Sequence, residues 1–294
     1  MEGFTLDPTI PSKTQDIVFR FEGVLDSDAN CFHLNYDSGR YREDELVKLI
    51  RDAIPSFALT HDEFEQYMKE RAISEANSKA INRISKAHKY AKGDYGELLL
   101  FLILEAFENA PKFVTKVKLR SSKGEQVKGY DCAHFTVNEA DQVTLWLGEA
   151  KFHQKVRSGV ADAIKSLKEH TEGAYLRDEL DLLYDNIEKN SNISQRYYDV
   201  LMPFLRKTRS LDDVTINIPV LLTYDSTAIG KSTSHTSEEF SKFLEAELQS
   251  ISNTHLKGKE WPKHQSTNII FYIFPLKSVA TIKQKLKDTE NALR

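Results

Sequence analysis

The sequence predicts a mixed α/β (α+β) fold, in which helices flank a central mixed sheet and a small N-terminal α+β lobe precedes it. Two observations predict this class. Strand-length apolar runs, rich in β-branched and aromatic residues, alternate with segments whose apolar residues repeat at helical spacing. Three strand-like runs follow one another directly, which indicates an antiparallel meander, whereas helices link the later strands and favour a mixed sheet.

Residues 1–90 are predicted to form the N-terminal lobe, which is also a candidate region for contact with a partner. Residues 1–16 are mostly polar with two prolines and predict a loose lead-in. Short strands are predicted within residues 17–25 and 31–37, and a helix over residues 41–54. Residues 60–90 begin with Thr60 and Glu63, the spacing of a capping box, and predict one or two solvent-facing helices.

Residues 91–294 are predicted to form the larger domain. Residues 93–107 are almost wholly apolar but too short for a membrane span, so they predict a buried helix. Strands are predicted at 112–120, 129–137, 143–152, 214–224 and 267–276. Helices are predicted at 158–170 (with Ser158 as the N-cap), 179–190, 194–207, 237–251 and 278–294.

The composition favours a folded, soluble protein. The 294 residues are 40% hydrophobic and 29% charged, and the net charge of -4 gives no global sign of nucleic-acid binding. No apolar run approaches the ~20 residues of a membrane span, and the N-terminus lacks the pattern of a secretory signal. Cys31 and Cys132 form neither a metal-binding spacing nor a disulfide framework, so a cytoplasmic location is expected.

Charged residues end an otherwise apolar strand at residues 145–152, Leu-Trp-Leu-Gly-Glu-Ala-Lys-Phe. Glu149 and Lys151 lie two positions apart, so their side chains share one face of that strand. Asp131 begins the preceding predicted strand, and pairing through the turn at 138–142 would bring it beside Glu149. Charges at such a site cost stability unless function retains them, although a surface ion pair is the plain alternative.

This arrangement predicts a metal site. Two neighbouring carboxylates, from Asp131 and Glu149, repel unless a cation separates them, and Mg²⁺ (or Mn²⁺) accepts such oxygens together with water and phosphate. The backbone carbonyl of Ala150 could add a ligand. A bound divalent ion acidifies water and stabilises charge on a phosphate, and Lys151 could assist. The set therefore predicts phosphodiester hydrolysis, whereas Asp131 alone could be a turn residue after Gly129.

The same pattern, following a helix that carries Glu97, resembles the PD-(D/E)xK nuclease superfamily. The core of that superfamily runs helix, three strands, helix and strand, which is the order predicted above. The resemblance implies a restriction-endonuclease-like core and a role for Glu97 in holding a metal or its water shell. A carboxylate near a helix start also offsets the helix dipole, which is the alternative for Glu97. Tyr130 stands where the superfamily motif has proline.

A closer resemblance, strongest over residues 90–170, is to the HamA effectors of Hachiman anti-phage systems. It rests on the segments YGELLLFLILEAF, KGYDCAHF and LWLGEAKF and on the SGVADAIKSL helix that follows. The resemblance implies a metal-dependent DNase that is restrained by a HamB helicase and released by DNA. The motif does not separate DNA from RNA, and a non-catalytic regulatory or DNA-binding subunit with this fold is the other alternative.

Basic residues give local candidates for nucleic-acid contact. Lys116, Lys118 and Arg120 alternate along one predicted strand, and Lys155 and Arg157 follow the candidate site. Such a face could follow a phosphate backbone, whereas an edge strand kept soluble by lysines is an equal alternative.

Two histidines lie near the candidate site in the sequence. His134, on the same strand as Cys132, is predicted to pack in the core rather than to bind a ligand. His153 and Gln154, just after Lys151, could touch a phosphate, but a solvent-facing helix start is an equal alternative.

Overall fold

The computed structural model describes residues 5–23, 29–90, 94–115, 130–170, 195–206, 208, 214–262 and 267–292. Its helices are α1 (Thr9–Gln15), α2 (Glu43–Ala58), α3 (His61–Lys69), α4 (Ile73–Tyr90), α5 (Asp94–Phe107), α7 (Val156–His170), α9 (Gln195–Leu205), α10 (Thr227–Lys231), α11 (Glu238–Ile251), the π-helical turn η2 (Ser252–Leu256) and α12 (Val279–Ala292). Its strands are β1 (Val18–Arg20), β2 (Ala29–Leu34), β3 (Tyr36–Asp37), β4 (Arg40–Tyr41), β5 (Lys112–Thr115), β6 (Cys132–Val137), β7 (Val143–Lys151), β8 (Thr215–Asp225) and β9 (Thr267–Leu276).

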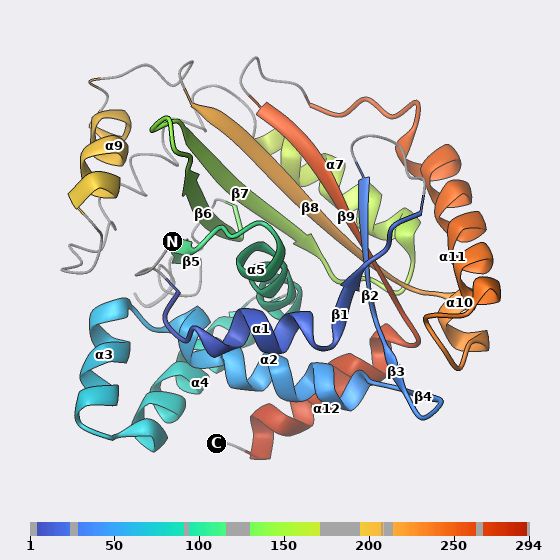
Figure 1. The fold of residues 1–294 in the computed structure, drawn as a ribbon, viewed down its shortest axis with the longest axis horizontal. Coiled ribbons are helices and arrows are strands. Elements are labelled where there is room, and N and C mark those ends of the chain that lie inside the picture. The colour runs from blue at the N-terminus through green and yellow to red at the C-terminus, as the bar shows by residue number, and fades with distance from the viewer. Residues whose placement is uncertain are drawn as a thin grey trace.

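A 7-stranded mixed sheet in the order β1-β2-β9-β8-β7-β6-β5 forms the centre of the molecule (Figure 1). The strands β5, β6 and β7 pair antiparallel, as the meander prediction requires. The strands β8 and β9 then add in parallel to β7, and β2 adds in parallel to β9. The predicted fold class, a mixed sheet flanked by helices, is confirmed.

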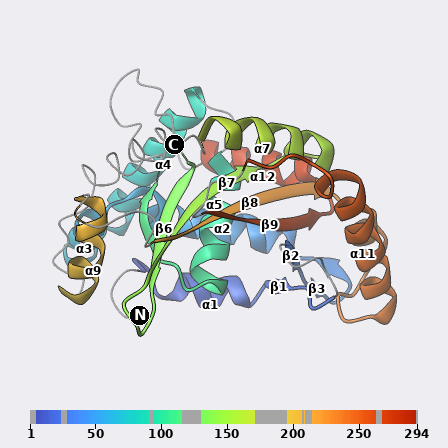
Figure 2. The same ribbon diagram turned by 90° about the horizontal axis from the view of Figure 1, so that it is seen from above.

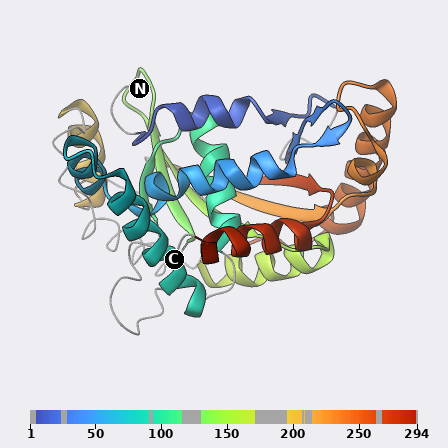
Figure 3. The same ribbon diagram turned by 90° about the horizontal axis from the view of Figure 1, so that it is seen from below.

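Apolar side chains cover both faces of this sheet. On one face, α1, α2, α5 and α12 pack against residues such as Trp146 and Tyr272. On the other face, α7, α9 and α11 pack against residues such as Leu145, Leu147 and Ile273. Figure 2 shows α7 and α1 on opposite sides of the strands, and Figure 3 shows α12 beside α2. The strands therefore carry apolar residues on both sides, which suits a sheet enclosed by helices.

Helix α5 is the buried helix that the sequence predicts. Seven consecutive residues, 98–104, are 0% exposed, because α1 and α2 pack against α5 from one side and β7 from the other. Such a helix is apolar on all sides, which is the pattern of a fully enclosed helix.

The N-terminal region shares this sheet and core. Its strand β2 pairs with β9, and its helix α2 packs with α5 and α12. The loose lead-in predicted for residues 1–16 is wrong in part, because residues 9–15 form α1 and Ile10 is fully buried. Pro11 lies in the first turn of α1, where proline removes no helical hydrogen bond, so the prolines do not prevent the helix. The boundary near residue 90 stays a prediction.

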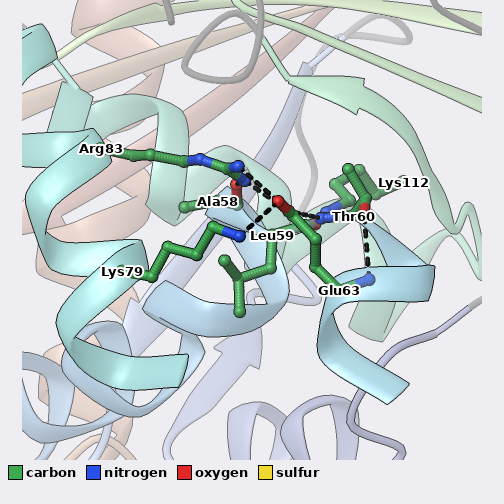
Figure 4. A network of polar contacts seen from close by, with 7 residues as sticks. All are labelled: Ala58, Leu59, Thr60, Glu63, Lys79, Arg83 and Lys112. Carbon is green, nitrogen blue, oxygen red and sulfur yellow. Dashed lines mark hydrogen bonds and ion pairs between the residues drawn. The ribbon is translucent and has the colours of Figure 1, made fainter. Parts of the chain in front are cut away.

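A polar network fixes the helices α2, α3 and α4 to one another (Figure 4). Thr60 and Glu63 form the predicted capping box at the start of α3. Arg83 of α4 donates to both carboxylate oxygens of Glu63 at 2.6 Å and to the Ala58 carbonyl at 2.9 Å. Lys112 of β5 donates to carbonyls at the end of α2, including that of Leu59 at 2.7 Å. A cation at a helix C-terminus satisfies carbonyls that the helix leaves open.

Most other predicted elements are observed. The helix predicted at 237–251 is α11, and Ser237 caps it, since its hydroxyl accepts from the Phe240 amide at 3.1 Å. The Ser158 cap is wrong, because α7 begins at Val156, whose side chain packs into the core and draws two more residues into the helix. The predicted helix at 179–190 lies outside the described residues.

Candidate active site

The strand β7 presents two different sets of side chains on its two faces. Alternation along the strand turns Trp146, Gly148 and Ala150 toward α5 and turns Leu147, Glu149 and Lys151 toward α7. The small residues allow close approach of the helices: a Cβ at Gly96 of α5 would lie 3.3 Å from the Ala150 Cβ. On the other face, a Cβ at Gly159 of α7 would lie 3.6 Å from the Lys151 Cβ.

Asp131 lies against the end of β7, next to Glu149. The register pairs Cys132 with Gly148, so one further step places Asp131 across from Glu149. The Asp131 amide donates to the Gly148 carbonyl at 2.9 Å, and its carboxylate accepts from the Ala150 amide at 2.9 Å. Asp131 therefore binds both residues that flank Glu149. The N–H and C=O groups of one strand residue point toward the same neighbouring strand. Because the Ala150 amide points toward Asp131, the Ala150 carbonyl points toward the β6 side of β7 as well.

Side chains from Lys151, Ser166 and His170 surround the carboxylate of Glu149, which is only 2% exposed. Lys151 forms an ion pair with Oε1. The hydroxyl of Ser166 donates to the same oxygen at 2.8 Å. The Nδ1 atom of His170 lies 3.5 Å from Oε2. Ser166 and His170 belong to α7, so the candidate site lies between the sheet and this helix.

Opposing effects set the pKa values of Glu149 and Lys151. Burial raises the pKa of Glu149, but the interactions with His170 and Lys151 outweigh burial and lower it below its usual range. Burial lowers the pKa of Lys151, but the charges of Glu149 and Asp131 raise it above its ordinary value. At neutral pH the pair is therefore a carboxylate and an ammonium.

Tyr130, at the position of the motif proline, packs against His170. The two rings are 5.2 Å apart in an edge-to-face arrangement, and the Tyr130 hydroxyl donates to the His170 carbonyl at 3.4 Å. Tyr130 is 3% exposed and His170 8%. The tyrosine thus closes one side of the space in which His170 faces Glu149.

Glu97 lies near the start of α5 and is 3% exposed. It belongs to the helix on the opposite face of β7 from Glu149. Its charge acts, together with burial and Asp131, to raise the pKa of the Cys132 thiol. The role of Glu97 in holding a metal or its water shell stays a prediction.

The basic candidates divide into two groups. Lys155 and Arg157 are exposed at the start of α7, beside the end of β7. Lys116, Lys118 and Arg120 lie outside the described residues. The structure adds Lys283 of α12, whose Nζ lies 5.3 Å from the centre of the Phe152 ring, one residue after Lys151. Lys283 therefore adds a cation from α12 near the end of β7.

The two histidines have different surroundings. His134 is fully buried, with Nδ1 2.8 Å from the Ala110 carbonyl and its ring against Phe101, which is the predicted packing role. His153 lies at the surface, 3.1 Å from a carboxylate oxygen of Asp162 on α7.

The donors present fit a hard divalent cation. Asp131 and Glu149 offer carboxylate oxygens and Ala150 a carbonyl on the same side, and Mg²⁺ commonly takes one or two carboxylates and fills its other positions with water and phosphate. Within the described residues, no group of three or more His, Cys, Asp and Glu side chains is arranged to hold a metal ion.

Sequence reasoning missed Ser166 and His170. The signal that could have found them is their spacing: Asp162, Ser166 and His170 recur every four residues and form one polar stripe along α7. The stripe adjoins the buried face of α7, formed by Val160, Ala163 and Leu167. Its direction relative to β7 required the structure.

The fold and the site together define a class of protein. The order helix, three antiparallel strands, helix and parallel strand, with an acidic pair and a lysine where the second strand begins and the third ends, is the restriction-endonuclease-like arrangement that the sequence predicts. A family model described as HamA matches residues 15–289, and the chain belongs to the HamA family. This family places the protein in Hachiman defence systems.

No curated protein matches the chain. Among the described helices, none combines the length and apolar character needed to cross a membrane.

Proposed function

We propose that this protein is a metal-dependent DNA endonuclease that acts as the effector of an anti-phage defence system. The observation that carries the proposal is the gathering of Asp131, Glu149 and Lys151 at the end of β7, where Glu149 is almost wholly buried. A carboxylate and an ammonium at the end of a core strand cost stability, so a chemical role explains their presence better than a surface ion pair does.

Asp131, Glu149 and the Ala150 carbonyl would hold Mg²⁺ or Mn²⁺. A bound divalent ion supplies an acidified water and stabilises negative charge on the phosphate. Lys151 forms an ion pair with Glu149 and carries its proton at neutral pH, so it can donate to a phosphate oxygen or orient the attacking water. Glu97, near the start of α5, would help to hold the ion or its water shell, which is the role that the resemblance implies.

The exposed cations Lys155 and Arg157 provide a surface for the nucleic-acid backbone next to the site. Their charges neutralise phosphates without reading bases, which suits cleavage with little sequence preference. Because the net charge of the chain is -4, this attraction is local. A local, modest attraction suits an effector whose activity is controlled by a helicase partner, which is the partner that the HamA family membership suggests.

The experiment compares cleavage of plasmid DNA, linear DNA and RNA with Mg²⁺, with Mn²⁺ and with a chelator. The variants are Glu149→Gln and Lys151→Met, and the matched control is Glu169→Gln, which changes an exposed glutamate of α7. We expect metal-dependent DNA cleavage by the wild type and the control and loss of cleavage in both site variants. Full cleavage by Glu149→Gln and Lys151→Met would refute the assignment.

The same experiment separates the alternatives. Preferential cleavage of RNA would make the protein a ribonuclease with this site. Absence of cleavage by the wild type, alone and with its helicase partner, would favour a non-catalytic subunit.

A further inference from the structure

The helix α7 places a hydroxyl donor, Ser166, and an imidazole, His170, against the carboxylate of Glu149 in the candidate active site. Ser166 and His170 are one helical turn apart, so they share a face of α7, and both meet the carboxylate of Glu149. Both residues lie beyond the Glu-x-Lys motif in sequence, and neither belongs to it. They are held by a helix, which fixes side-chain positions more rigidly than a loop does.

The two carboxylate oxygens of Glu149 have different contacts. A carboxylate oxygen accepts about two hydrogen bonds. Oε1 has two donors, Lys151 and Ser166, so both of its acceptor positions are taken. Oε2 faces only His170 among the described residues, at 3.5 Å, and keeps acceptor capacity. Ser166 and Lys151 therefore anchor Oε1, whereas Oε2 is buried beside His170 and makes no hydrogen bond within the described residues.

The position of His170 is itself determined by packing. Tyr130, which immediately precedes Asp131, lies edge-to-face with the imidazole and donates to the His170 carbonyl. The ring is 8% exposed, so it has little space in which to turn away from Glu149. The chain thus links the start of β6, the end of α7 and the carboxylate of Glu149 through direct contacts.

We propose that Ser166 and His170 are positioning residues that orient the carboxylate of Glu149 toward a divalent cation. The inference rests on the proposed function, because it assigns Glu149 as a ligand. Without these side chains, Glu149 keeps its charge but loses its fixed orientation. Partners of this kind change metal affinity or activity by about 10- to 100-fold in other metal sites.

The test is the affinity for Mn²⁺ alone, measured by titration calorimetry with the whole chain in the absence of nucleic acid. The variants are Ser166→Ala, Ser166→Thr and His170→Asn, in which asparagine keeps a donor near the Nδ1 position. The matched control is Ser158→Ala, which removes an exposed hydroxyl from the same helix. The melting temperature without metal is measured for each protein, so that loss of folding is separated from loss of binding.

We expect Ser166→Ala to weaken Mn²⁺ binding by about 10- to 100-fold at a nearly unchanged melting temperature. Ser166→Thr, which keeps the hydroxyl, and His170→Asn should retain most of the affinity, and Ser158→Ala should bind as the wild type does. Equal or tighter binding by Ser166→Ala, with a wild type that binds Mn²⁺, would overturn this inference alone. A wild type that binds no Mn²⁺ and cleaves no substrate would overturn the proposed function as well.

Discussion

Replacing Lys151 by methionine tests whether the charges at the end of β7 depend on one another. The substitution keeps an apolar chain of similar length and removes the ammonium that pairs with Oε1 of Glu149. The carboxylate is 2% exposed, so water cannot replace the lost partner. Removing one member of a buried ion pair costs about 3–5 kcal/mol of unfolding free energy. Ser166 and His170 still face Glu149, so we expect the lower end, about 3 kcal/mol.

The assay is urea denaturation, in which the midpoint and the slope are measured separately. A matched control is Lys155→Met, at an exposed lysine next in the chain, which should change stability by less than about 0.5 kcal/mol. The double variant Glu149→Gln, Lys151→Met removes both charges of this pair, so no unpaired carboxylate is left at position 149, and it should recover most of the loss. If Lys151→Met unfolds at the same urea concentration as the wild type, the buried pair does not depend on Lys151 and the reasoning fails.

Three further predictions test other parts of the structure. Burial raises the pKa of Glu63, but hydrogen bonds from Arg83 and Lys79 outweigh it and lower the pKa to about 2. The ionised Glu63 carboxylate therefore stabilises the fold above pH 4.5, and this contribution is lost as the pH falls toward 2. Glu63→Gln should make the unfolding free energy depend less on pH between 4.5 and 2. The same pH dependence in the variant and the wild type would contradict the hydrogen bonds assigned to Glu63. A Cβ at Gly148 would lie 2.6 Å from the Cys132 Sγ and 2.7 Å from Leu100 Cδ2. Gly148→Ala should therefore lower the unfolding free energy by about 1–3 kcal/mol. A variant that melts at the wild-type temperature would contradict this close packing. Replacing Lys155 and Arg157 by glutamine should weaken DNA binding and reduce the slope of log affinity against log salt by about 0.9 per lost phosphate contact, and an unchanged slope would exclude them from the interface.

Local sequence patterns predict most strands and helices, because the alternation of apolar residues and the capping residues lie close together in the sequence. The capping box at Thr60 and Glu63 and the apolar run of α5 are seen as the sequence indicates. Helix α1 was not predicted, because its seven residues include proline and few apolar side chains, and tertiary packing of Ile10 decides it. The early start of α7 has the same cause, since Val156 packs against the sheet.

The candidate site was predictable only where the chemistry lies within one strand pair. Glu149 and Lys151 share a face because strands alternate, and a short turn brings Asp131 beside them. The residues Ser166 and His170 could not be assigned, because nothing in the sequence of α7 says which of its faces meets β7. Lys283 lies far along the chain, and only the docking of α12 places it near Phe152.

The pairing of β2 with β9 has a practical consequence for anyone who shortens this protein. A fragment that begins at residue 91 would lack α1 and α2, which cover α5, and would leave the β9 edge unpaired. Residues 98–104 would then face water on one side, and bare strand edges and apolar helices invite self-association. Work on the isolated residues 91–294 would therefore report on a fragment that tends to aggregate, whereas point substitutions in the whole chain keep the core closed.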